Sequence, residues 1–140
     1  MEISISSEQD HLLKVAEKSA IPDLLDSGVF YPSLFIHDGS EVTFLQFETD
    51  AEVDEIREIA RQAIVSDYKD CLAYVFAYDS QIRIDDNESK ALILETGDVE
   101  DLYAFEFAIC YNRSNKTNEP RQVFSKLSSL LQNTGDELSE

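Results

Sequence analysis

The segments 71-CLAYVFAYD-79 and 102-LYAFEFAICY-111 decide the fold of this 140-residue chain. In both segments small residues alternate with aromatic or large aliphatic ones, and successive side chains of a β-strand point to opposite faces of the sheet. Neither face has the character of a polar, solvent-exposed surface, which is typical of central strands that are covered on both sides. The alternation therefore predicts a sheet with one face of small residues and one face of aromatic residues.

A first helix is predicted from Ser6 or Ser7 to about Ser19, because apolar residues recur there at helical spacing. Ser6 as N-cap and Gln9 three residues later form a capping box, which is a sequence signature of a helix start. Pro22 lacks the amide hydrogen that a helix interior needs, so it is expected to interrupt this helix, with one further turn over residues 23–27 before Gly28 ends the segment.

Two more helices are predicted, over residues 49–66 and residues 120–131. The helix of residues 49–66 starts with a capping box of Thr49 and Glu52 and has one clean apolar stripe. Alanines within that stripe permit a close approach, so we expect this helix to cover the face of small residues. The two terminal helices are then left to cover the aromatic face.

Residues 31–37 and 41–48 are predicted to pair as a hairpin, because Asp38-Gly39 between them favours the left-handed conformations of a tight turn. The short connections that follow favour antiparallel neighbours, arranged as a meander. The strands of this meander are expected at residues 71–79, 81–85, 89–95 and 102–111.

The predicted fold class is α+β, with a mainly antiparallel sheet of five to six strands and helices packed on it. The expected order of elements is α-β-β-α-β-β-β-β-α. Residues 1–132 are assigned to a single domain, since the length suits one core. Residues 133–140 are expected to form a flexible acidic tail.

Eleven Lys and Arg residues against 29 Asp and Glu residues give a formal net charge of -18. Charge repulsion of this size disfavours binding to nucleic acids and to anionic membrane surfaces. The N-terminus carries Glu2 where a signal peptide would be basic, and the apolar runs are too short to span a bilayer. The sequence therefore predicts a cytoplasmic protein that binds neither nucleic acid nor membrane.

No pattern typical of a cofactor or metal site is present, and we expect neither. The four glycines are isolated, so there is no phosphate-binding loop or dinucleotide fingerprint, and zinc-ligand spacing is absent. Cys71 and Cys110 lie in apolar strand-like segments and are expected to be reduced, buried thiols. His37 beside Asp38 is a weak candidate for catalysis, since adjacent strand residues point apart.

Glu106 is the one carboxylate that breaks the alternation, because it falls among the small residues of its strand. A buried carboxylate must be paired, hydrogen-bonded or protonated. Glu95 on a neighbouring strand is a conceivable partner, and two carboxylates can divide acid and base roles. The simpler interpretation is that Glu106 lies at a sheet margin or contacts Arg57 or Arg61.

The segments 73-AYVFAYD-79, 82-IRID-85, 91-ALILETG-97 and 105-FEFAICY-111 together resemble an uncharacterised family of small bacterial proteins. In that family a tyrosine-aspartate strand end, an aspartate turn, an apolar strand ending in glutamate and glycine, and an aromatic-alanine strand follow in this order. Ser80 and Asn87 depart from the pattern, so the turns are expected to differ. The resemblance implies an α+β fold and no particular activity or ligand.

Three functions remain as alternatives. The first is a non-catalytic module that binds another protein, or a second copy of itself if the terminal helices leave the aromatic face uncovered. The residues named for that face are Tyr74, Phe76, Tyr103, Phe105 and Phe107. The second is a small hydrolase or isomerase that uses Glu95 and Glu106, and the third is an acidic inhibitor or immunity-type protein with a basic partner.

Overall fold

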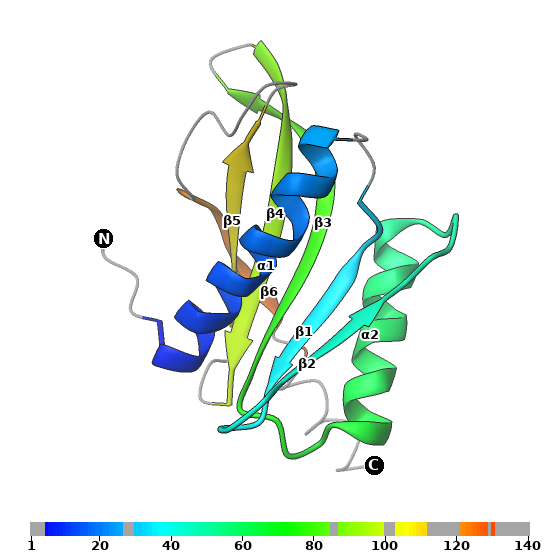
Figure 1. Ribbon diagram of the computed structural model, residues 1–140, viewed down its shortest axis with the longest axis vertical. Coiled ribbons are helices and arrows are strands. Elements are labelled where there is room, and N and C mark those ends of the chain that lie inside the picture. The colour runs from blue at the N-terminus through cyan, green and yellow to red at the C-terminus, as the bar shows by residue number, and fades with distance from the viewer. Residues whose placement is uncertain are drawn as a thin grey trace.

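Within the described residues, six antiparallel strands form one sheet in the order β2-β1-β3-β4-β5-β6, and two helices pack on its faces (Figure 1). This computed structural model describes residues 5–26, 30–84, 87–99, 103–111, 121–128 and 130. The elements are α1 (Ser7–Asp26), β1 (Ser33–His37), β2 (Val42–Gln46), α2 (Val53–Asp67), β3 (Ala73–Ile84), β4 (Asn87–Asp98), β5 (Tyr103–Cys110) and β6 (Arg121–Ser128). The predicted fold class, a single α+β domain built on an antiparallel sheet, is confirmed.

The two helices lie on opposite faces of the sheet, because they contact alternate residues of β3. α1 packs on the small side chains of β3, which are Ala73, Val75 and Ala77. α2 packs on Tyr74 and Phe76, which point to the other face and are fully buried. The prediction had assigned these faces to the opposite helices. It was wrong because α1 carries buried alanines of its own, at positions 16 and 20, and so approaches the small face closely.

The alternation of β5 is reversed relative to that of β3. Phe76 lies opposite Glu95 on β4, and Glu95 lies opposite Glu106 on β5, so these three side chains share the α2 face. The small residues of β5 therefore lie on the same face as the aromatic residues of β3, while Phe107 packs on the α1 side. A single aromatic face does not exist, and the dimer interface predicted on it has no support from Tyr74 and Phe76.

The β1–β2 hairpin has the predicted turn. Gly39 has a φ of 105°, a conformation that glycine adopts without strain. The Asp38 carboxylate accepts hydrogen bonds from the amides of Glu41 at 2.8 Å and Ser40 at 2.9 Å. These bonds lower the pKa of Asp38, because they favour its charged form.

α1 begins with the predicted capping box and continues beyond its predicted end. The Ser6 amide donates to Oε1 of Gln9 at 2.8 Å, and the Gln9 amide donates to Oγ of Ser6 at 3.1 Å. Pro22 does not interrupt the helix, which runs on to Asp26. The added turn buries Leu24 in the core beneath α1, and this burial offsets the loss of one helical hydrogen bond.

α2 lacks the capping box predicted at its start. The residue before the helix is Glu52, and its side chain makes no capping hydrogen bond. Oγ1 of Thr49 accepts instead from the Ala51 amide at 3.3 Å. The helix is held by its buried stripe, Ile56, Ala60 and Ile64. Tertiary packing, rather than the cap, thus sets the position of α2.

The strands β3, β4 and β5 form a meander as predicted, and the structure differs from the prediction in two places. Residues 73–84 form one long strand instead of two short ones. The helix predicted at residues 120–131 is wrong over Arg121–Ser128, where β6 pairs with β5. Its apolar spacing suits either a short strand or a helix, and the free edge of β5 offers backbone partners that favour a strand. The predicted tail, residues 133–140, lies outside the described residues.

Candidate functional site

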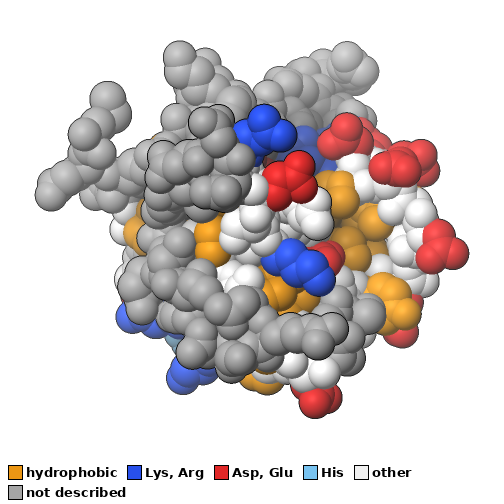
Figure 2. All heavy atoms as spheres, turned by 90° about the horizontal axis from the view of Figure 1, so that it is seen from above, with side chains coloured by type: hydrophobic (Ala, Val, Ile, Leu, Met, Phe, Trp, Pro, Cys, Tyr) orange, Lys and Arg blue, Asp and Glu red, His pale blue; other side chains and the backbone are white. Residues whose placement is uncertain are grey.

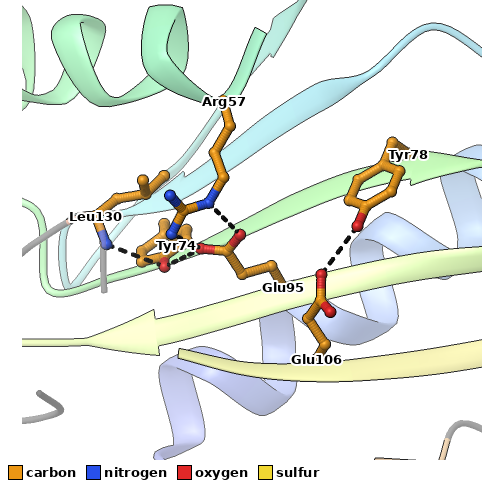
Figure 3. A network of polar contacts seen from close by, with 6 residues as sticks. All are labelled: Arg57, Tyr74, Tyr78, Glu95, Glu106 and Leu130. Atoms are coloured by element: carbon orange, nitrogen blue, oxygen red, sulfur yellow. Dashed lines mark hydrogen bonds and ion pairs between the residues drawn. The ribbon is translucent and has the colours of Figure 1, made fainter. Parts of the chain in front are cut away.

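The two candidate carboxylates, Glu95 and Glu106, lie in one polar cluster between α2 and the sheet (Figure 3). The cluster consists of Arg57 from α2, Tyr74 and Tyr78 from β3, Glu95 from β4 and Glu106 from β5. We call these five residues the carboxylate cluster. The cross-strand register places the members from β3, β4 and β5 on the same face of the sheet. This is the face that α2 covers, so Arg57 can reach them.

Glu95 forms a two-pronged ion pair with Arg57. Nε of Arg57 donates to Oε1 at 2.7 Å, and Nη2 donates to Oε2 at 3.1 Å. The Glu95 side chain is 1% exposed and that of Arg57 is 23% exposed. Burial lowers the pKa of Arg57, but the hydrogen bond and charge of Glu95 more than offset this, so that the pKa is raised.

Tyr74 links this ion pair to the C-terminal part of the chain. Its hydroxyl donates to Oε2 of Glu95 at 2.5 Å and accepts from the amide of Leu130 at 3.2 Å. Both Tyr74 and Leu130 are fully buried. Burial first, and then the charge of Glu95, raise the pKa of Tyr74 well above its usual value. The hydroxyl therefore stays protonated and serves as a permanent donor to Glu95.

Glu106 is half-buried and is held by Tyr78, whose hydroxyl donates to Oε2 at 2.9 Å. Burial raises the pKa of Glu106, the Tyr78 hydrogen bond opposes this, and the charge of Glu95 adds to the rise. Burial and the Glu106 charge also raise the pKa of Tyr78. Of the two carboxylates, Glu106 alone has appreciable contact with solvent.

Arg57 and Arg61, which the sequence offered as possible contacts of Glu106, both form ion pairs with other glutamates. Arg57 directs the hydrogen bonds described above to Glu95. Arg61 pairs with Glu58 on its own helix. The cluster as a whole is an ion pair and two tyrosine hydroxyls that fasten α2 and residue 130 to the sheet. Glu106 is the one carboxylate of the cluster that solvent, or a substrate, could reach.

Two cavities lined by described residues lie away from the cluster. One, of about 230 Å³, has Ile36, Asp38, Tyr68 and Cys71 among its lining residues. The other, of about 390 Å³, lies against α1 at residues 14–22. Neither of these two cavities is lined by Glu95 or Glu106.

The structure also places the remaining candidates from the sequence. Nδ1 of His37 accepts from the Gly39 amide at 2.9 Å, and the ring lies edge-on to that of His11 with centroids 5.6 Å apart. Cys71 and Cys110 are buried and neither is part of a disulfide, as predicted. Burial raises the pKa of Cys71 to about 11, which keeps its thiol protonated. The described residues contain no group of three or more potential metal ligands.

Sequence reasoning missed the hydroxyls of Tyr74 and Tyr78, which it treated only as aromatic bulk. Their spacing of four places both on the face of β3 that carries Phe76. A buried tyrosine hydroxyl usually finds a partner, so tyrosine in place of phenylalanine was the available signal.

Comparison of the chain with protein-family models, with curated proteins and with solved structures gave no match. The resemblance to a family of small bacterial proteins therefore stays a prediction. Among the helices of the described residues, none is long and apolar enough to cross a membrane.

Proposed function

We propose that this protein is a non-catalytic module that binds another protein. The observation that carries the proposal is the state of Glu95, which is 1% exposed and engaged on both oxygens by Arg57 and Tyr74. A general acid or base must reach the proton that it transfers, and a nucleophile must reach its substrate. Glu95 reaches neither, which supports a structural role for Glu95 and its ion pair with Arg57.

The surface supports a binding role. Several large apolar side chains are exposed, among them Phe44 at 48% and Ile59 at 47%. Figure 2 shows one face of the molecule, where acidic side chains gather along one edge and apolar side chains are exposed beside them. Exposed apolar groups bordered by charge are typical of surfaces that bind other proteins.

The proposal is tested by isolating a partner with the immobilised protein from extracts of the source cell at low salt. The partner is then purified, and its affinity is measured for the wild type and for Glu106→Gln. We expect a defined stoichiometry, an affinity that falls as salt rises, and equal binding by both proteins. The absence of any partner that rebinds in purified form would refute the proposal.

An enzyme that uses Glu106 is the second candidate, favoured by one observation. Glu106 lies directly opposite Glu95, is half-buried and has a raised pKa, as a general acid needs. This candidate predicts that Glu106→Gln keeps the fold and abolishes a reaction. Tyr78 can still donate to the amide oxygen of the introduced glutamine, so the variant is expected to fold and the test is clean.

A further inference from the structure

The outer edge of β2 presents backbone groups that no described strand uses. β2 is the first strand of the sheet and pairs only with β1 within the described residues. The Phe47 amide donates inward to the Pro32 carbonyl at 2.9 Å, and the Glu41 carbonyl accepts inward from the Asp38 amide at 3.2 Å. In an antiparallel pair the inward and outward residues alternate. The amides and carbonyls of residues 42, 44 and 46 therefore point outward.

This edge lacks the usual protections against strand addition. Edge strands are commonly guarded by Lys, Pro or a bulge, and the β2 sequence, 42-VTFLQ-46, contains no charge and no proline. Its pairing with β1 has a regular register. At its centre Phe44 leaves 48% of its surface exposed while its ring contacts Phe35 on β1, with centroids 5.0 Å apart. A strand laid along β2 would cover this ring.

The charge around β2 defines the partner. Residues 38–55, which include β2 and the first turn of α2, contain no Lys or Arg. They contain seven exposed carboxylates, at Asp38, Glu41, Glu48, Asp50, Glu52, Asp54 and Glu55. A second copy of the chain would bring two such groups together, whereas Lys and Arg side chains would neutralise them.

We infer that the β2 edge binds a basic, extended segment of a partner protein, which adds to the sheet as a seventh strand. This inference rests on the proposed function and names its site and ligand class. Main-chain hydrogen bonds to residues 42, 44 and 46 supply the affinity. An apolar side chain beside Phe44, and Lys or Arg side chains beside the seven carboxylates, supply the specificity.

The probe for the first test is a capped peptide of twelve residues that alternates Lys and Val, with a Glu and Val peptide as the control. Fluorescence anisotropy at low salt should show binding of the Lys peptide only, with an affinity that falls as salt rises. Failure of the Lys peptide to bind overturns the inference.

The second test separates strand addition from charge attraction. Gln46 is exposed and its amide points outward, so Gln46→Pro removes one edge donor and leaves the inward ladder intact. Gln46→Ala loses the same side chain and keeps the amide, which makes it the matched control. We expect Gln46→Pro to weaken peptide binding about tenfold relative to Gln46→Ala. Equal affinities would show that the peptide adheres by charge alone and would overturn the inference.

A modified peptide keeps the test valid even if Gln46→Pro fails to fold. N-methylation of two consecutive central residues blocks both edges of the Lys peptide and preserves its charge. Its affinity for the unaltered protein should fall about tenfold, and an undiminished affinity would overturn strand addition. A dimer, seen by light scattering, that Gln46→Pro dissociates and Gln46→Ala does not would assign the edge to a second copy and overturn the basic partner.

The protein partner isolated under the proposed function separates the two claims. If it binds Gln46→Pro and Gln46→Ala equally, the module function stands and the β2 site is wrong. If no partner rebinds but the Lys peptide still discriminates between these variants, the edge chemistry stands and the proposed function has failed.

Discussion

Replacement of Arg57 by methionine should destabilise the protein strongly, because it leaves the Glu95 charge buried without its cation. Breaking a buried ion pair by removing one member costs about 3–5 kcal/mol. We expect about 3 kcal/mol here, since Arg57 is already 23% exposed and Tyr74 still donates to Glu95. With a urea m-value of about 2 kcal/mol per molar, the unfolding midpoint should fall by about 1.5 M. The chain contains no Trp, so circular dichroism is the signal to follow.

The converse change, Glu95→Gln, should cost less, about 1–2 kcal/mol, because Arg57 can turn its charge toward water and Glu95 cannot. The double variant Arg57→Met with Glu95→Gln should recover at least half of the loss caused by Arg57→Met. A loss below about 1 kcal/mol for Arg57→Met, or no recovery in the double variant, would refute the view that this pair fastens α2 to the sheet.

Three other experiments test the pKa of Glu106, the effect of Pro22 on α1 and the burial of the two cysteines. The folded pKa of Glu106 is raised, so the stability that its protonated form contributes is full below the ordinary value of 4.5 and is lost as pH rises through the folded pKa. Urea unfolding should therefore show the free energy of unfolding of Glu106→Gln rising relative to that of the wild type as the pH increases above 4.5, and a constant difference would contradict the assignment. Pro22→Ala should raise the free energy of unfolding by about 1 kcal/mol or more by restoring a helical hydrogen bond at an exposed position, and an unchanged melting temperature would count against it. Cys71 and Cys110 should react with a thiol reagent only in denaturant, and rapid labelling of the native protein would contradict their burial.

Local features of the chain were predictable where a turn or cap is defined by a few adjacent residues. The Asp38-Gly39 turn and the box of Ser6 and Gln9 formed as expected, because each satisfies backbone groups through neighbours in sequence. The box expected at Thr49 did not form, because packing of α2 on the sheet set the start of the helix.

Features that depend on cross-strand register were not predictable. Alternation in one strand says which residues share a face, but it does not say how two strands are aligned. Phe76 of β3 lies opposite Glu95, and Glu95 lies opposite Glu106. These two pairings place Glu106 on the face covered by α2, where Tyr78 binds it. β6 was missed for a related reason, since its partner is the edge of β5 and its own pattern fits either helix or strand.

The ion pair between Arg57 and Glu95 joins positions that lie 38 residues apart in the chain. A single substitution that removes either charge leaves the other uncompensated. Loss of Arg57 leaves the Glu95 charge in the core, and loss of Glu95 leaves the Arg57 charge at the margin of the core. Descendants of this sequence should therefore keep both residues or exchange both, and a charged residue at one position should predict the opposite charge at the other. We therefore expect positions 57 of α2 and 95 of β4 to covary, because mutations at these two positions are accepted together.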